Sequence, residues 1–252
     1  MIFVHTQHSD NSLEYLRAMT DQMVRLASEP TKVAFNSYEV ECPGSMGHGL
    51  AIRRALQVIP KFPDHLHVVC DADTMVVAPG WDAALNEFMD AGFDAVGVAY
   101  EDRGGFSSGD SDVQTYKGLP TFTWICIKPM PDVPWQDFDP RPVLDSNGNV
   151  SHIPQSYGRQ QLLQDVGWQM PFFVRDHGLC TAAWRMVRDD DRRVLQGVGE
   201  YSEEWHLPDG TPFVVHQRGS RKHRFMSEPH SKPFYDAVNR WTDGQRPVQQ
   251  AP

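Results

Sequence analysis

The chain lacks the features that mark a membrane protein or a secreted precursor. None of its apolar runs approaches the roughly 20 residues that a membrane-spanning helix needs. Its first residues, Met1-Ile2-Phe3-Val4-His5, have no basic leader followed by a long apolar stretch, so they do not have the pattern of a signal peptide. We therefore expect a cytoplasmic protein that makes no contact with a membrane.

Cysteine is scarce and scattered. The four cysteines, Cys42, Cys70, Cys126 and Cys180, form no C-x-x-C motif, so a structural zinc site or a thiol redox pair of that kind is not expected. Cys70 and Cys126 lie within apolar runs and have the pattern of reduced core residues. This usage favours a reducing compartment.

Basic residues are outnumbered as well. The sequence has 23 Lys and Arg against 33 Asp and Glu, which gives a net charge of -10. Proteins that hold many nucleic-acid phosphates without sequence preference are usually basic. The charge therefore argues against a surface that binds nucleic acid all over, and leaves open a local patch that binds a nucleic-acid acceptor.

Apolar periodicity predicts alternating strands and helices, which favours an α/β fold with a parallel sheet. The expected strands are at 2–6, 32–38, 66–70, 94–100, 121–128, 172–174 and 213–216. The expected helices are at 12–26, 49–59, 82–91 and 157–166, and an Asn-Gly hairpin is expected at 144–150. We expect one domain over residues 1–230, followed by a partly flexible C-terminal helix or tail over 231–252.

The first chemical signal is a pair of carboxylates at the end of an apolar strand, in the run Leu66-His67-Val68-Val69-Cys70-Asp71-Ala72-Asp73. Two hard oxygen ligands at a strand end can hold Mn²⁺ or Mg²⁺ and leave positions for phosphate oxygens. A metal there would neutralise a nucleoside diphosphate as it leaves. The alternative is a polar turn, which is the commoner meaning of such a motif by itself. The buried strand before it and the helix start at Pro79-Gly80-Trp81 favour a site.

The second signal follows a late strand, in the run Val214-Val215-His216-Gln217-Arg218-Gly219-Ser220-Arg221-Lys222. Imidazole is a good ligand for a borderline ion such as Mn²⁺. Turn amides and basic side chains are suited to hold a diphosphate. The alternative is a solvated basic loop after a structural histidine.

With these motifs in this order, the sequence resembles the GT-A fold glycosyltransferases of the family-two-like type. The resemblance implies a single Rossmann-like domain with a mixed, mostly parallel sheet flanked by helices. It implies that Asp71, Asp73 and His216 bind the metal. It further implies that the donor is bordered by Ala72, Gly219, Ser220, Arg221, Lys222, Thr6, Asn36, Ser37, Gly47 and Arg53. Among these, Gly47 belongs to a loop at Gly44–Gly49, and Arg53 is a candidate nucleotide contact.

One feature departs from that family. Many inverting members place a carboxylate before the glycine that opens the acceptor-side helix, and no carboxylate precedes Gly158 here. A general base must accept the acceptor proton in an inverting enzyme. Asp145 and Asp176 are the nearest candidates, although the hairpin position of Asp145 favours a turn-forming role. Retention and inversion of the anomeric configuration both stay open.

The expected activity is a hexosyl- or pentosyltransferase that uses a UDP-sugar with Mn²⁺ or Mg²⁺. The acceptor hydroxyl is left open between a modified nucleobase in DNA, a protein and a glycan, and the oligomeric state is not set. In its small size and lack of accessory domains the chain resembles small phage-type transferases. If it is phage-encoded, we expect it in the host cytoplasm. Three alternatives remain: a haloacid-dehalogenase-like phosphatase with Asp71 as nucleophile, a nucleotidyltransferase that uses Asp71 and Asp73, and a non-catalytic carbohydrate-binding protein.

Several tryptophans are further candidates for stacking on a sugar or base ring. They are Trp124, Trp135, Trp168, Trp184 and Trp205. We expect two or three of them to lie in the core.

Overall fold

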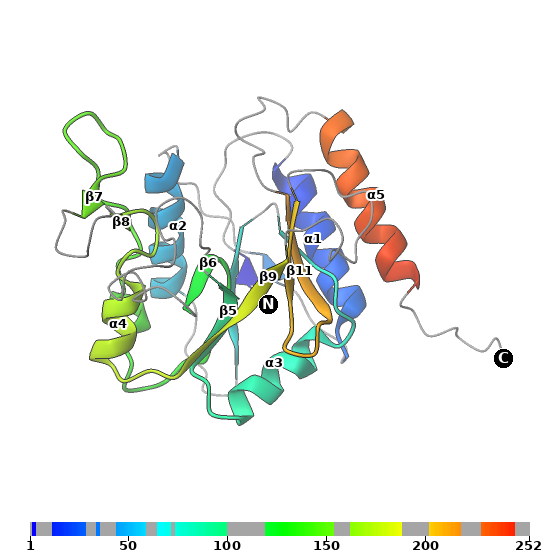
Figure 1. Ribbon diagram of the computed structural model, residues 1–252, viewed down its shortest axis with the longest axis horizontal. Coiled ribbons are helices and arrows are strands. Elements are labelled where there is room, and N and C mark those ends of the chain that lie inside the picture. Colours follow the sequence, from blue (N-terminus) through cyan, green and yellow to red (C-terminus); the bar gives the residue numbers. More distant parts are fainter. Residues whose placement is uncertain are drawn as a thin grey trace. The chain divides into compact units, whose positions relative to one another are not determined.

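The computed structural model describes residues 2–3, 12–28, 34–35, 44–58, 65–71, 74–99, 119–153, 162–187, 202–217 and 228–244. These residues have a mixed α/β structure, which confirms the expected class (Figure 1). The helices are α1 (Ser12–Leu26), α2 (Gly44–Val58), α3 (Trp81–Asp90), the 3₁₀ helix η2 (Trp135–Asp137), α4 (Met170–Asp176) and α5 (Glu228–Gly244). The strands are β1 (Ile2–Phe3), β2 (Ala34–Phe35), β3 (His67–Cys70), β4 (Thr74–Val76), β5 (Ala95–Ala99), β6 (Pro120–Ile127), β7 (His152–Ile153), β8 (Leu162–Leu163), β9 (Thr181–Val187), β10 (Ser202–His206) and β11 (Pro212–Gln217).

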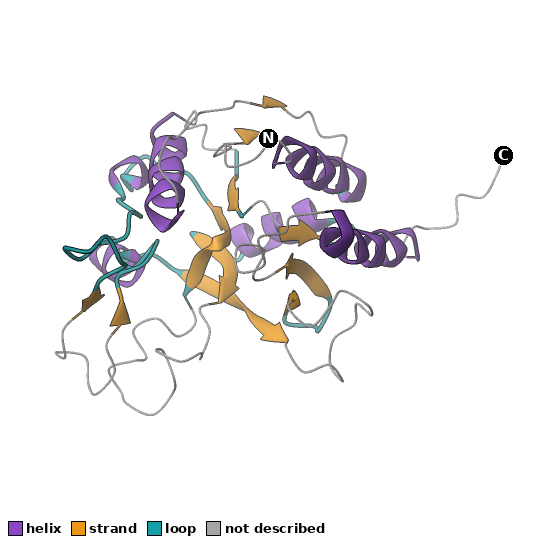
Figure 2. Cartoon of the chain, turned by 90° about the horizontal axis from the view of Figure 1, so that it is seen from above, coloured by secondary structure: helices purple, strands orange, loops and turns teal. Residues whose placement is uncertain are grey.

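The chain divides into two compact units. The first consists of Met1–Asp10, Ala34–Cys70 and Phe88–Ala183, and the second of Asn11–Val33, Asp71–Glu87 and Trp184–Pro252. Strand order is β3-β6-β5-β9 in the first unit and β9-β10-β11-β4 in the second, with the start of β9 in one and its end in the other. Figure 2 distinguishes these strands from the helices.

Strand β6 organises the first unit because it pairs with strands on both of its edges. It runs antiparallel to β3 on one side and to β5 on the other. The short pair β1–β2 is parallel. The β3–β6 and β5–β6 ladders therefore differ from the mostly parallel pairing that the strand-helix alternation predicted. The reason is that β6 returns between two strands that run parallel to each other but are not neighbours.

Aromatic and aliphatic side chains form the core of the first unit. Its buried members are Ile52, Leu56, Ala95, Phe122, Ile125, Ile127, Trp135, Phe138 and Met170. The rings of Phe122 and Phe138 stack with centroids 5.4 Å apart. Phe173 on α4 packs against this cluster, with its centroid 4.8 Å from that of Trp135.

The second unit is built on an antiparallel sheet. β10 and β11 form a hairpin around a Pro-Asp-Gly turn in which Asp209 accepts a hydrogen bond from the backbone N–H of Thr211 at 2.8 Å. β11 also pairs with β4, and β10 pairs with β9. Gly210 has φ of +90°, a conformation that glycine adopts without the steric cost other residues meet. The turn therefore follows directly from its sequence.

Helices α1 and α5 lie side by side in the second unit, as Figures 1 and 2 both show. The Arg25 guanidinium near the end of α1 donates to the Thr242 hydroxyl on α5 at 3.1 Å. The Trp81 indole N–H at the start of α3 donates to the carbonyl of Met23 at 2.8 Å. Trp81 therefore ties the predicted helix start to α1.

The strongly periodic segments were predicted well. α1 has the predicted bounds, α3 differs from its prediction by one residue at each end, and β3, β5, β6 and β11 lie within about two residues of theirs. Residues Glu228–Gly244 form helix α5. The amphipathic spacing of Phe234, Ala237 and Val238, all buried, explains why it forms a helix.

The predicted Gly44–Gly49 loop is wrong, because these residues form the first turns of α2. A Cβ added at Gly49 would lie 2.7 Å from the Cα of Arg141. Glycine at this position therefore allows close packing between a helix and a neighbouring segment. The sequence could not distinguish this role from loop formation.

The predicted strand at 172–174 is also wrong, because these residues lie in α4. Pro171 occupies the first turn of that helix, where its fixed φ and missing N–H are tolerated. Met170, Phe173 and Val174 have helical i, i+3, i+4 spacing and contact the core of the first unit. A short apolar run is ambiguous between strand and helix until its packing partner is known.

The described part of the predicted helix at 157–166 is not helical. Leu162–Leu163 form β8, which pairs with β7 in antiparallel register. The N–H of Gln164 donates to the carbonyl of Ser151 at 2.8 Å, and the carbonyl of Gln164 accepts from Val143 at 2.9 Å. These non-local bonds replace the helical ones, so tertiary pairing overrides the local periodicity.

Candidate functional site

The segment that follows β3 is anchored at Asp71, the first of the two carboxylate residues. The backbone N–H of Thr74 donates to the carbonyl of Asp71 at 3.1 Å, and the Thr74 hydroxyl donates to the same carbonyl at 2.7 Å. A threonine can bond back to a carbonyl three residues earlier through both its amide and its hydroxyl. Thr74 is fully buried at the start of β4. The backbone of Asp71 is therefore tied to the first residue of β4.

His216 lies beside Thr74. In the β11–β4 ladder its register partner is Thr74, and in the β10–β11 ladder its partner is Glu203. Residues directly opposite one another in antiparallel strands present their side chains on the same face. Thr74, His216 and Glu203 therefore share one face of the second unit. The backbone of Asp71, which is bonded to Thr74, and His216 are therefore near each other although they are far apart in the sequence.

A carboxylate faces the imidazole on this surface. Glu203 Oε2 lies 3.6 Å from His216 Nδ1, and the two side chains are 6% and 13% exposed. The indole ring of Trp205 has its centroid 5.9 Å from that of the imidazole. The 3.6 Å separation is too long for a hydrogen bond but within the range of a charge interaction. His216 is thus held in a nearly buried environment between a carboxylate and an aromatic ring.

A second carboxylate–histidine pair belongs to the same strand. Glu204 Oε2 lies 2.9 Å from His206 Nε2, and the Glu204 side chain is 0% exposed. Because successive strand residues point to opposite faces, Glu204 lies on the face opposite Glu203. No sequence pattern singled out Glu203, Glu204 or His206. Counting back from the Pro-Asp-Gly turn would not have found Glu203, because the register shifts by one residue between Trp205 and His206; a regular hairpin would set Ser202 opposite His216.

Several predicted donor residues lie outside the described residues. They are Thr6, Asn36, Ser37, Ala72, Asp73, Gly219, Ser220, Arg221 and Lys222. Among the residues that are described, no group of three or more His, Cys, Asp or Glu side chains is arranged to hold a metal. Asp71 and His216 are the two predicted ligands that are described, and both belong to the second unit. Their carboxylate and imidazole donors suit Mn²⁺.

Gly47 and Arg53 belong to α2 in the first unit. Gly47 is buried within the helix. Arg53 Nη1 lies 3.8 Å from Asp139 Oδ2, and Arg141 binds the same carboxylate with donors at 2.6 and 2.8 Å. The hydrogen bonds from Arg141, together with the positive charge of Arg53, hold the pKa of Asp139 below its ordinary value. In this structure Arg53 therefore contributes to an ion-pair cluster.

The two candidate bases also belong to the first unit. Asp145 Oδ1 accepts hydrogen bonds from the N–H groups of Asn147 and Asn149 at 2.8 and 2.9 Å, so Asp145 forms the predicted hairpin turn. Asp176 is the last residue of α4, so the prediction that it follows a strand is wrong. Its carboxylate is 58% exposed and lies 2.7 Å from the guanidinium of Arg175.

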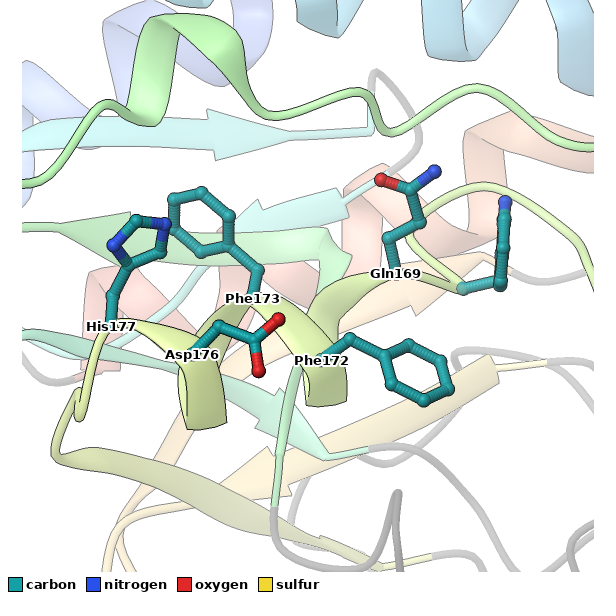
Figure 3. A pocket seen from close by; sticks show the side chains of 6 residues that line it. Gln169, Phe172, Phe173, Asp176 and His177 are labelled. Carbon is teal, nitrogen blue, oxygen red and sulfur yellow. The ribbon is translucent and has the colours of Figure 1, made fainter.

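A groove of about 380 Å³ lies along α4 in the first unit. It is lined by Trp168, Gln169, Phe172, Phe173, Asp176 and His177. Figure 3 shows the ring of Phe173 beside that of His177, whose centroids are 4.5 Å apart. The other four tryptophans considered above, Trp124, Trp135, Trp184 and Trp205, are buried. The core therefore takes more of the five than expected, and Trp168 alone of them lines this groove.

The cysteines and the helices add two observations. Cys126 is fully buried, as predicted for a core residue, and this burial raises the pKa of its thiol far above the ordinary value, whereas Cys70 is only partly buried. No helix within the described ranges is both long and apolar enough to cross a bilayer.

No protein-family model matches the chain, and no curated protein is significantly similar to it.

Proposed function

We propose that this protein is a metal-dependent glycosyltransferase of the GT-A type that transfers a sugar from a UDP-sugar to an acceptor hydroxyl. The observation that supports it is the register of β4 and β11. This register sets His216 opposite Thr74, whose amide and hydroxyl both bind the carbonyl of Asp71. This places one residue of each motif, Asp71 and His216, near Thr74 within the second unit, which supports the proposal.

In this proposal Asp71, Asp73 and His216 hold Mn²⁺ or Mg²⁺. When bound, the ion supplies the positive charge that makes the nucleoside diphosphate a better leaving group. Ser220, Arg221 and Lys222 bind the diphosphate oxygens through hydroxyl, guanidinium and ammonium groups. The nearly buried surroundings of His216 would strengthen its own interaction with the ion by excluding water.

A thermal-shift experiment with UDP and Mn²⁺ tests the proposal, because a ligand of the native state raises its stability. We expect the two together to raise the Tm by several degrees. This is the shift expected for a chain of this size when the ligand concentration is about 100 times its Kd. His216→Ala and Asp73→Ala should each lose most of this shift. His177→Ala, which alters an exposed histidine of the first unit, is the matched control and should keep it.

The same preparations separate the competing activities. Release of UDP from a UDP-sugar, dependent on Mn²⁺ and lost in His216→Ala, agrees with the proposal. Hydrolysis of a generic phosphate ester that is lost in Asp71→Asn, with no UDP-dependent shift, would instead identify a phosphatase. A shift with UTP and Mn²⁺ but none with UDP would identify a nucleotidyltransferase.

A further inference from the structure

Strand β10 places two buried glutamates next to each other, and each faces a histidine. Glu203 faces His216 through Nδ1 at 3.6 Å, and Glu204 faces His206 through Nε2 at 2.9 Å. Burying a carboxylate is costly unless a partner compensates for its lost hydration. Glu204 meets this requirement with a short contact within its own strand. Glu203 reaches across to the next strand, and its partner is the histidine of the second motif.

The ring nitrogen that faces Glu203 matters for what the imidazole can bind. Because Nδ1 faces the carboxylate, a metal held by His216 would be bound through Nε2. A histidine that binds a metal through one nitrogen commonly donates its other N–H to a carboxylate, which fixes the ring and makes the metal-binding nitrogen more basic. The Trp205 ring, with its centroid 5.9 Å from that of the imidazole, adds a packing contact on the same face.

We propose that Glu203 is the positioning residue of His216: its buried carboxylate holds Nδ1 so that Nε2 is directed at the divalent cation. This inference rests on the proposed metal site. It adds a residue that neither sequence motif contains. A closure of a few tenths of an ångström converts the 3.6 Å contact into a hydrogen bond.

Binding of Mn²⁺ alone to the full chain tests this role. Calorimetry gives the affinity, and pulsed electron paramagnetic resonance detects the coupling between bound Mn²⁺ and a histidine nitrogen. We expect Glu203→Gln to weaken Mn²⁺ binding about 10- to 100-fold, the usual effect of losing such a partner, and to reduce the nitrogen coupling. Glu203→Asp keeps the charge and should restore part of both.

Glu204→Gln is the matched control. It removes an equally buried carboxylate from the adjacent residue of the same strand, on the opposite face. A general disturbance of β10 would affect both variants, whereas a positioning role affects Glu203→Gln alone. Circular dichroism checks that each variant is folded. If Glu203→Gln does not fold, Glu203→Asp decides, since withdrawing the carboxylate by one methylene should still reduce the nitrogen coupling.

The outcomes separate the inference from the function it rests on. If the wild-type chain binds no Mn²⁺, the proposed function is wrong and the inference falls with it. If the wild type binds Mn²⁺ with a nitrogen coupling and Glu203→Gln binds it equally well, only the inference is wrong. Weaker binding with an unchanged nitrogen coupling would also overturn it, because Glu203 would then be a ligand itself and not a support for His216.

Discussion

The two units bury different kinds of side chain. In the described part of the chain, the buried polar or charged residues are Thr20, Gln22, Thr74, Glu203, Glu204, His206 and Thr242, and all of them belong to the second unit. The first unit buries an aromatic and aliphatic cluster and two glycines at close backbone contacts. A buried polar group that is paired, as Glu204 is with His206, fixes side-chain geometry as well as adding to stability. The unit that buries them is also the one that contains Asp71 and His216.

The largest expected effect comes from breaking the tighter of the two buried pairs. His206→Ala removes the 2.9 Å contact of Glu204, whose side chain has no exposure to water. Losing one partner of such a pair costs about 3–5 kcal/mol of unfolding free energy. His216→Ala should cost less, about 1–3 kcal/mol, because its 3.6 Å contact with Glu203 is longer than a hydrogen bond and both side chains retain some exposure. Urea denaturation of both variants measures the difference. Equal losses would mean that the two pairs do not differ as their distances indicate.

The next effect tests close packing in the first unit. A Cβ added at Gly97 would lie 2.4 Å from the carbonyl oxygen of Trp124 and 2.9 Å from the Cα of Ile125. Both are backbone atoms of β6, so the strand itself must shift. We expect Gly97→Ala to reduce the unfolding free energy by about 2–3 kcal/mol. Gly244→Ala is the control, since nothing lies within 4 Å of the added atom, and it should change stability by less than about 1 kcal/mol. A Gly97→Ala variant as stable as its control would refute the close approach.

The smallest effect concerns the charged cluster of the first unit and depends on pH. The pKa of Asp139 is lowered chiefly by its hydrogen bonds from Arg141. A lowered folded-state pKa stabilises the protein fully above the unfolded value of about 3.9, and this stabilisation is lost as the pH falls through the folded-state pKa. At pH 7 Asp139→Asn should cost about 1 kcal/mol, because the side chain is partly exposed.

Urea titrations at several pH values test this prediction. The difference in stability between the wild type and Asp139→Asn should be constant near neutral pH and shrink in acid. Asp176→Asn is the control, because its ion pair with the adjacent Arg175 is mostly exposed and should contribute little. A difference that grows as the pH falls would contradict the direction of the pKa shift.

Local sequence signals predicted the elements whose secondary structure does not depend on contacts with distant segments. The apolar stripe of residues 12–26 and the Asn-Gly turn at 147–148 both specify their structure within a few residues. The signals failed where a distant segment supplies the deciding contact. Phe173 is helical because its ring packs against those of Trp135 and Phe138. Leu162 is extended because β8 pairs with β7.

The candidate site divides in the same way. By itself the sequence determined that Asp71 follows a strand and that His216 lies in a late one, because each motif is continuous in the chain. Only the tertiary structure decided that Thr74 is the register partner of His216 and that Glu203 faces the same imidazole. The physical reason is that strand pairing is non-local: side-chain alternation says which residues share a face within one strand, but hydrogen-bonded register decides which residues meet across strands.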